Sequence, residues 1–155
     1  MLTMSKYAYQ SPDTSQTLQM GLDEYYKNHP DFVDSDGFLG QEASVVKAHD
    51  AAHVFFGLGP TSAEELLVEV MTVLGCNLPS KKMTNIVKKG FIGKVIGHFG
   101  IWRLAKRLFT TLPRVIRAAY RAVRMKKKWP HFDYEQYLGR PLKDLREEFG
   151  IKVGL

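Results

Sequence analysis

Two histidines four residues apart, followed by a glutamate, are the residues of this chain best suited to chemistry. His49 and His53 belong to the segment HDAAH, and eleven residues separate His53 from Glu65. On a helix, side chains four positions apart project from one face about one turn apart, so two imidazoles can share a divalent cation. The chain can reverse between Gly57 and Pro60 and offer Glu65 as a third ligand. Two imidazoles and one carboxylate leave positions open for water or substrate, as a catalytic metal centre requires.

The identity of the carboxylate ligand is open between Glu65 and Glu69. On an ideal helix that begins at Thr61, Glu65 and Glu69 both point away from the leucine stripe, so periodicity alone places Glu65 in solvent. A metal site therefore requires this face to meet the helix that carries the histidines. Glu69 lies one turn beyond Glu65 and is the alternative ligand or an outer partner.

Length and composition indicate one folded domain. The chain has 155 residues, 45% of them apolar, which is enough for one ordinary hydrophobic core. No stretch alternates apolar and polar residues over the length of a strand. We expect an all-α fold, with a flexible segment at residues 1–14 and a single compact domain of about five to six helices at residues 15–155. The single cysteine, Cys76, is expected to pack in the core.

Helical periodicity predicts the elements that position the histidines. A short first helix is expected within residues 15–26. In the second helix, apolar residues share one stripe with His49 and His53, so both imidazoles should face inward, and the helix should end at Gly57. His29 and His131 lie in polar surroundings and are expected at the surface.

Capping signals predict the remaining helices. Thr61 and Glu64 have the spacing of a capping box and open a helix that runs to about Leu74. Pro113 suits a first helical turn and is expected to start a basic helix. The helices that follow Leu74 are expected over residues 90–102, 113–128 and 142–149.

Charge is distributed unevenly along the chain. Residues 70–132, the basic segment, contain no acidic residue and fifteen of the 22 Lys and Arg, whereas the rest of the chain holds all 16 acids. Such a segment is expected to meet an anionic partner, and nucleic acid, lipid headgroups and phosphorylated metabolites all qualify. The basic side chains of the helix that starts at Pro113 share one face: Arg114, Arg117, Arg121, Arg124 and Lys128.

Targeting and membrane signals are weak in this chain. Residues 1–16 do not have the pattern of a secretory signal, and no apolar run approaches the roughly 18 residues of a membrane span. We expect a cytoplasmic protein that does not cross the membrane. The glycines between residues 90 and 100 recur at helical spacing, which favours close helix packing or room for a ligand tail.

Two other metal-enzyme classes use similar residues. The zinc-protease pattern HExxH has a glutamate directly after the first histidine, where this chain has the shorter Asp50, so a peptidase is disfavoured. An HD-type metal phosphohydrolase could formally use His29, the His49-Asp50 doublet and Asp133, but this interpretation leaves His53 and Glu65 without a role.

The motif resembles a known family. HDAAH, the eleven-residue interval and Glu65 are similar to the HDxxH and Glu signature of the coenzyme Q (ubiquinone) biosynthesis protein four family, including Gly57 and the Pro60-Thr61 turn. The similarity extends to Leu78-Pro79 and to the closing segment from Arg140 to Ile151. It covers roughly residues 15–151.

The resemblance implies an all-helical, peripherally membrane-associated protein that binds polyprenylated quinone precursors and a divalent metal. The family is linked to loss of the C1 carboxylate from the prenylated ring with hydroxylation at that carbon. The family is also linked to a scaffold role, in which it organises the enzymes of quinone biosynthesis. The alternative is therefore a non-catalytic prenyl-lipid-binding scaffold.

The resemblance also assigns roles to residues. His49, His53 and Glu65 would hold the metal, with Asp50 as fourth ligand or catalytic acid–base group. Zinc is expected first, and iron(II), cobalt or manganese suit the same ligands. An isoprenoid tail would lie along residues of the glycine-rich helix: Gly93, Gly97, Phe99 and Trp102.

The expected partners follow from these roles. They are a polyprenylated quinone precursor, the anionic surface of the inner membrane, which the arginine face would contact, and other quinone-biosynthesis enzymes. A homodimer is left open, and nucleic acid is not expected as a partner. Nucleic-acid binding through the basic segment would be a third class of function, and it predicts affinity for duplexes that falls steeply with salt.

Overall fold

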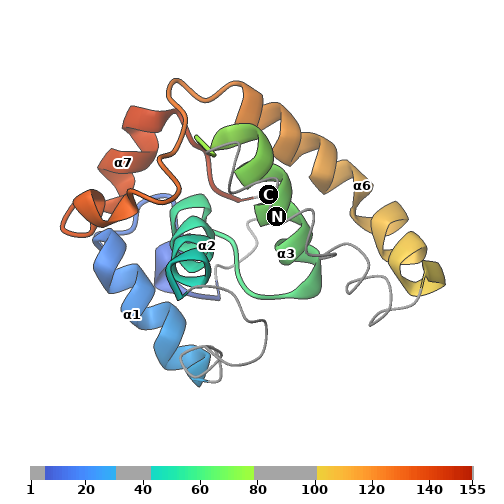
Figure 1. Ribbon diagram of the computed structural model, residues 1–155, viewed down its shortest axis with the longest axis horizontal. Helices are drawn as coiled ribbons and strands as arrows, with labels where there is room; N and C mark the ends of the chain where they lie inside the picture. The colour runs from blue at the N-terminus through green and yellow to red at the C-terminus, as the bar shows by residue number, and fades with distance from the viewer. Residues whose placement is uncertain (1–5, 31–42, 79–100, 155) are drawn as a thin grey trace.

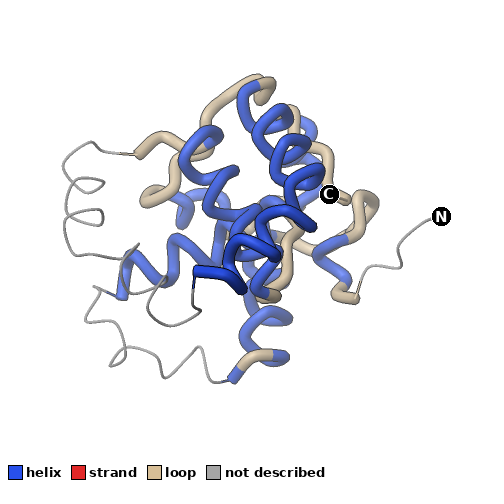
Figure 2. The backbone as a smooth tube through the Cα atoms, turned by 90° about the vertical axis from the view of Figure 1, so that its right-hand side faces the viewer, coloured by secondary structure: helices blue, strands red, loops and turns tan. Residues whose placement is uncertain are grey.

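The computed structural model describes residues 6–30, 43–78 and 101–154, with the backbone alone for residues 43 and 101–109. These residues form helices and no strand (Figure 2), which confirms the all-α fold. Five α-helices and two short 3-10 helices occur in this order: η1 (Ala8–Gln10), α1 (Leu18–Asn28), α2 (Ala43–Phe56), α3 (Ser62–Gly75), α6 (Ile101–Val123), η4 (Tyr134–Tyr137) and α7 (Leu142–Phe149).

Helix α2 lies at the centre of the described structure, with α1, α3 and α7 around it (Figure 1). Its second half is almost completely buried, as expected for a helix that is surrounded by others, and the buried residues include Asp50 and His53. Where α1 crosses α2, a Cβ atom on Gly21 would lie 2.5 Å from Val54 Cγ1. A glycine is therefore needed here for the two helices to pack this closely.

The turn between α2 and α3 brings the chain back over α2. Gly57 has a φ of 69°, in the left-handed region that favours glycine, and it ends α2 as expected from the sequence. The hydroxyl of Thr61 accepts a hydrogen bond from the backbone N–H of Glu64 and caps α3. Helix α3 therefore starts one turn before Glu65. This start determines where along α2 the side chain of Glu65 makes contact.

Helix α6 packs alongside α3 and is longer than the sequence predicted (Figure 1). The expectation that a new helix begins at Pro113 is wrong, because α6 runs through Pro113 without a break. Proline removes one backbone hydrogen bond from the helix, but Pro113 is exposed, so water can reach the carbonyl that loses its donor. Ala118 and Ala122 are fully buried on the side that faces α3.

Residues 6–14 belong to the segment that was expected to be flexible, and three of them, Tyr7, Tyr9 and Thr14, are buried. Tyr9 is completely buried, and its ring stacks on that of Tyr7 with centroids 5.5 Å apart. The hydroxyl of Tyr9 donates to the carbonyl of Leu58. Two aromatic side chains around a single 3-10 turn are too few to form a helical period, and this is why the pattern gave no sign of the contact.

Arg146 connects this segment to α2 and α7. It is only 3% exposed, and its guanidinium donates to the carbonyls of Val54 and Phe55 at the end of α2. It also donates to the carbonyls of Tyr9 and Ser11. A cation at a helix C-terminus is favoured by the helix dipole. Arg146 therefore anchors the C-terminal end of α2, just after His53.

Candidate metal centre

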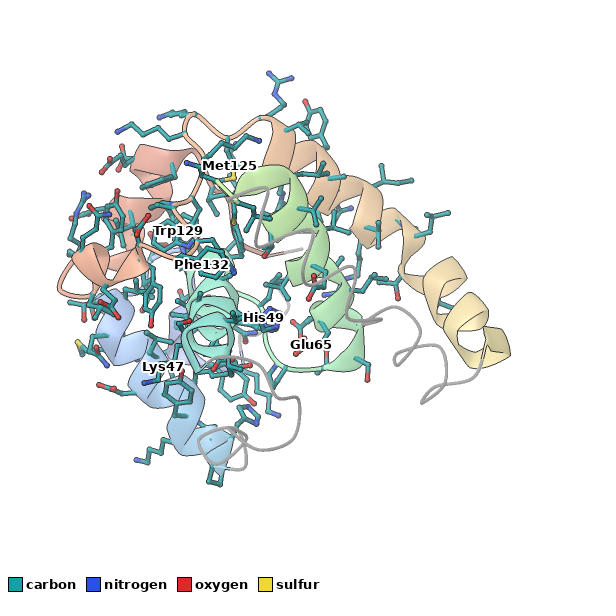
Figure 3. The ribbon with its side chains drawn as sticks, viewed as in Figure 1. Lys47, His49, Glu65, Met125, Trp129 and Phe132 are labelled. Atoms are coloured by element: carbon teal, nitrogen blue, oxygen red, sulfur yellow. The ribbon has the colours of Figure 1, made fainter. Side chains whose placement is uncertain are left out.

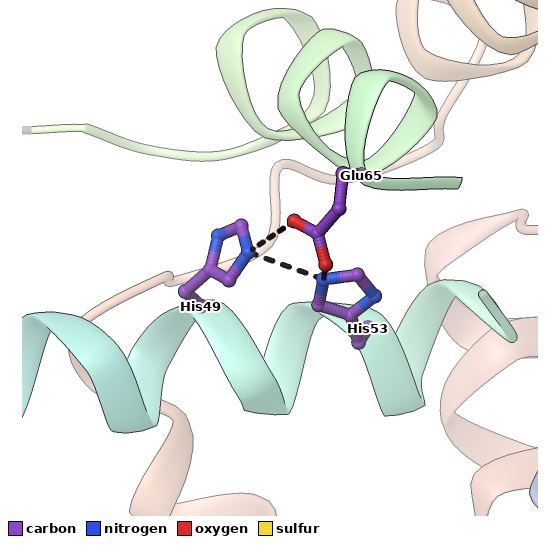
Figure 4. A group of neighbouring side chains, drawn as sticks. All are labelled: His49, His53 and Glu65. Atoms are coloured by element: carbon purple, nitrogen blue, oxygen red, sulfur yellow. Dashed lines mark hydrogen bonds and ion pairs between the residues drawn. The ribbon is translucent and has the colours of Figure 1, made fainter. Parts of the chain in front are cut away.

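His49 and His53 on α2 face Glu65 on α3 (Figure 4). The Nε2 atoms of the two histidines lie 3.1 Å apart. One oxygen of Glu65 lies 3.2 Å from His49 Nε2, and the other lies 3.2 Å from His53 Nε2. Donor atoms bound to one tetrahedral zinc at about 2.0–2.1 Å are themselves about 3.3 Å apart. These three groups, which could hold a metal ion, are therefore close to the spacing that a small divalent cation needs.

The site is buried at one end and open at the other. His53 is completely buried, and its ring stacks on Tyr25 with centroids 5.5 Å apart, which fixes the direction of the imidazole. The side chains of His49 and Glu65 are 28% and 42% exposed. A ligand can therefore approach past His49 and Glu65, while His53 forms the inner wall. In Figure 3 the labelled side chains of His49 and Glu65 point toward one another between α2 and α3.

The three groups perturb one another electrostatically. Burial by itself would lower the pKa of His49, but the hydrogen bond and charge of Glu65, with the charges of Glu69 and Asp50, raise it above its usual value. Burial would raise the pKa of Glu65, whereas hydrogen bonds from His49 and His53 hold it at about 2. The ionised Glu65 therefore favours the protonated form of His49, and a cation that binds there must displace that proton.

Glu65, rather than Glu69, is the carboxylate between the two histidines. The face of α3 that periodicity alone placed in solvent meets α2, because the turn at Gly57 folds α3 back over it. Glu69 lies on the other side of the His49 ring, with an oxygen 3.8 Å from Nδ1. This is the position of an outer partner that orients a ligating imidazole.

Asp50 is directed to a different neighbour. It is 5% exposed, and its carboxylate accepts a hydrogen bond of 3.0 Å from the hydroxyl of Tyr26 on α1. Burial raises the pKa of Asp50, and the Tyr26 bond opposes that shift in part. Asp50 is not among the three described residues that could hold the ion together. Its role as fourth ligand or acid–base group remains a prediction.

His131 lies near the site, although the sequence predicted a surface residue. It is 4% exposed, and its Nδ1 is buried without a hydrogen-bond partner among the described residues. Burial, together with the charge of His49, lowers the pKa of His131 to about 4, so its ring is neutral near pH 7. No spacing rule relates residue 131 to residue 49, and no pattern in the sequence could have found it.

His29, which the phosphohydrolase interpretation would use together with His49, has its own partner. The Nε2 atom of His29 lies 3.0 Å from the hydroxyl of Tyr7, and Asp133 is exposed. Neither belongs to the group of described residues that could hold a metal. This geometry gives the HDxxH and Glu interpretation, with His49, His53 and Glu65, the stronger support.

The predicted lipid-binding residues lie largely outside the description. Gly93, Gly97 and Phe99 are outside the described residues, and Trp102 lies in the part of α6 for which only the backbone is described. The predicted tail site therefore stays a prediction.

The predicted membrane-contact residues lie on or after α6 and differ in their surroundings. Arg117 and Arg124 are exposed. Arg114 lies 4.0 Å from Glu64, and Arg121 donates to the carbonyl of Lys152. The ammonium of Lys128 donates to the carbonyl of Leu74 at the end of α3. Part of this basic set therefore also holds α6 and the segment after it against the rest of the protein.

None of the described helices is both long enough and apolar enough to cross a membrane. This agrees with the sequence, in which no apolar run reaches the length of a span.

Comparison with known proteins identifies the family. No curated protein and no solved structure matches the chain. The family model described as coenzyme Q (ubiquinone) biosynthesis protein Coq4 matches residues 43–154, a range that contains both histidines, Glu65 and all helices from α2 to α7. The match covers most of the chain and includes the residues that carry the resemblance in the sequence. The protein belongs to the coenzyme Q (ubiquinone) biosynthesis protein Coq4 family and has a role in ubiquinone biosynthesis.

Proposed function

We propose that the protein is a metal-dependent enzyme that removes the C1 carboxylate of a polyprenylated aromatic precursor as carbon dioxide, with hydroxylation at that carbon, at the membrane surface. Molecular oxygen would be the oxidant and the source of the new hydroxyl oxygen. The observation that carries this proposal is the convergence of His49 Nε2, His53 Nε2 and the Glu65 carboxylate within 3.2 Å of one another. Two imidazoles and one carboxylate that are open on one side form a donor set with room for a substrate.

The residues of the site have different proposed roles, which are metal binding, orientation of a ligand and proton transfer. His49, His53 and Glu65 would hold the metal, with zinc as the first choice and iron(II), cobalt or manganese as alternatives. When bound, the metal supplies positive charge and open coordination positions. The ring of Tyr25 packs against His53 and fixes the direction of this buried ligand. Asp50, whose pKa is raised by burial, is proposed as the group that holds or moves a proton beside it.

The rest of the proposal concerns the substrate tail and the surface. The residues proposed to line the isoprenoid tail are Gly93, Gly97, Phe99 and Trp102. Arg114, Arg117, Arg121, Arg124 and Lys128 are proposed to face anionic headgroups, where each exposed basic side chain contributes about 1 kcal/mol. Other enzymes of quinone biosynthesis are proposed partners, because the product of one step must pass to the next without leaving the membrane.

Release of labelled carbon dioxide tests this proposal. Protein loaded with each candidate metal is incubated with a prenylated hydroxybenzoate that carries the label in its carboxyl group. We expect release from the wild type and loss of release in Glu65→Gln, with the fold intact by circular dichroism. Glu69→Gln is the matched control, because it removes the same charge one turn away and should retain most of the activity.

The alternative function is a non-catalytic prenyl-lipid-binding scaffold. Binding of the metal and of a prenylated ring without release of carbon dioxide under any metal would contradict the enzyme and leave the scaffold. Equal release by the wild type and Glu65→Gln would contradict the metal mechanism.

A further inference from the structure

The apolar surface of α6 is wider than the part that α3 covers. Thr111, Ala118 and Ala122 are buried on the covered side. Further around the helix, four large apolar side chains are exposed, between 41% and 61% of their surface. These four are spaced four, four and three residues apart, which places them on one continuous stripe of a helix. They are Leu112, Ile116, Tyr120 and Val123, called here the α6 stripe.

Arginines border the α6 stripe on the side away from α3. At 100° per residue, Arg117 and Arg124 follow directly after Tyr120 around the helix, on the side opposite to the buried alanines. Arg124 donates to the hydroxyl of Tyr120, and its guanidinium carbon lies 5.3 Å from the centre of that ring. In Figure 3 side chains of α6 project from the helix on the side away from α3. An exposed apolar stripe and a row of exposed cations thus lie next to each other.

We propose that α6 docks on the surface of an anionic lipid bilayer, with the α6 stripe inserted at the boundary of the acyl chains and Arg117 and Arg124 at the lipid phosphates. This arrangement matches an interfacial helix, which buries one apolar face and keeps its basic side chains at headgroup level. The proposal rests on the proposed function only in taking the membrane as the place of action. It adds the residues that enter the membrane, which are apolar and not the basic residues predicted from the sequence.

Charge argues against a second copy of the chain on this surface. The basic segment, residues 70–132, contains no acidic residue, so neither α6 nor the undescribed residues 79–100 offer a negative charge. A symmetric dimer across the α6 stripe would place arginines of one chain beside those of the other. A nucleic acid would satisfy the arginines but would leave the apolar stripe in water. An anionic bilayer complements both parts of the surface.

Vesicle sedimentation tests the proposal with the full-length protein. Vesicles are phosphatidylcholine alone or phosphatidylcholine with phosphatidylglycerol. We expect binding that requires phosphatidylglycerol. The double variant Ile116→Ser and Val123→Ser should weaken binding by about tenfold or more, the change expected from losing even one apolar side chain of this size from an apolar environment. Serine leaves the net charge unchanged, so the loss reports insertion and not electrostatic attraction.

Three further variants make the test specific. Met20→Ser on α1, which is also half-exposed, should bind vesicles like the wild type. Arg117→Gln with Arg124→Gln should reduce the preference for phosphatidylglycerol. Glu65→Gln should bind normally, so failure of the metal chemistry cannot be mistaken for failure of docking. Since all the substituted α6 residues are exposed, these variants should melt at nearly the wild-type temperature.

A fluorescent variant gives a direct readout of depth. Ile116→Trp should shift to shorter emission wavelength on vesicles and should be quenched by lipids with a nitroxide on the upper acyl chain. Wild-type binding by the serine double variant, or no quenching in the Ile116→Trp variant beyond that of the wild type, would overturn the proposal. A dimer in light scattering that dissociates in the serine variant would assign the stripe to a second copy and overturn it as well.

Discussion

Glu65 is the residue on which the candidate metal centre depends. Each of its oxygens contacts a different histidine, at 3.2 Å in both cases. Glu69 is close to His49 alone, at 3.8 Å from the other ring nitrogen. Two carboxylates one turn apart therefore differ in what they can contribute. Glu65 can bind a cation that both imidazoles share, whereas Glu69 can only orient one of them.

This difference predicts the effect of removing each carboxylate on metal affinity. Glu65→Gln should weaken zinc binding by well over about 100-fold, the upper end of the loss when an outer partner is removed. Glu69→Gln should weaken it by about tenfold or less. Competition with a chromophoric chelator measures both affinities. Equal losses in the two variants would place the metal elsewhere around His49.

The raised pKa of His49 predicts how zinc affinity varies with pH. A raised pKa means that the proton persists to higher pH than on a free imidazole, so protons compete with the metal over that whole range. Affinity should rise with pH by about tenfold per unit until His49 is deprotonated, and then level off. Since the charge of Glu69 contributes to the shift, Glu69→Gln should move this rise to lower pH. An affinity that does not vary between pH 6 and 8 would contradict the assignment of His49.

For single residues, the sequence predicted the direction of the two histidines better than it predicted the residues that contact them. Four-residue spacing on an apolar helix was enough to place His49 and His53 on one inward face. Glu65 could not be placed by periodicity, because the approach of α3 to α2 depends on the turn at Gly57 and on packing between distant segments. The bond from Tyr26 to Asp50 joins two helices, and no local pattern encodes it.

Among the elements, the pairing of α1 with α2 determines the environment of Asp50. The helices can approach this closely only because Gly21 has no side chain, since a Cβ there would lie 2.5 Å from Val54 and 3.2 Å from Leu142. Tyr26, which donates to Asp50, lies just over one turn further along α1.

Gly21→Ala is therefore expected to destabilise the fold. Alanine gains about 1 kcal/mol of helix propensity, but the overpacking at Val54 costs about 1–3 kcal/mol. The net loss should be accompanied by a weaker Tyr26 to Asp50 bond as α1 moves away. Gly139→Ala is the matched control, since nothing lies within 4 Å of the added Cβ. Urea denaturation compares the two, and a Gly21→Ala variant as stable as the control would contradict the close packing.

The elements also show where local signals suffice. The end of α2 at Gly57 and the cap of α3 at Thr61 depend on backbone conformation and nearest neighbours, and both were predicted. The start of α6 was predicted wrongly at Pro113. A proline signals a helix start only when the preceding residues cannot continue the helix, and here α6 begins at Ile101. Among the described side chains of α6, buried residues occur both before Pro113, at Thr111, and after it, at Ala118 and Ala122.

In the whole molecule, Arg146 joins segments that are far apart in the sequence. Its guanidinium donates to four carbonyls, on η1, on the segment after η1 and at the end of α2, from its own place on α7. Removal of the side chain takes away the donor of the buried carbonyls of Tyr9 and Phe55, whereas the carbonyls of Val54 and Ser11 also accept from the backbone N–H groups of Gly57 and Thr14. The position of α2, and with it the spacing of the two histidines, depends on this contact.

Arg146→Met should therefore lower the free energy of unfolding by about 3 kcal/mol or more, since each unsatisfied buried acceptor costs about 1–3 kcal/mol. Arg140→Met is the control, because Arg140 pairs with Glu148 at 2.8 Å near the surface, where water and salt screen such a pair and it contributes little to stability. Denaturant melts of both variants measure the difference. A loss in Arg146→Met no greater than in the control would contradict the role given to Arg146.

The metal content of the protein tests the central claim most directly. Wild-type protein and Glu65→Gln are purified without chelator and examined by elemental analysis, with circular dichroism to confirm that both are folded. We predict one divalent transition metal per wild-type chain and almost none in the variant. A wild type without stoichiometric metal even after reconstitution, or a variant that retains it in full, would contradict a metal centre at His49, His53 and Glu65.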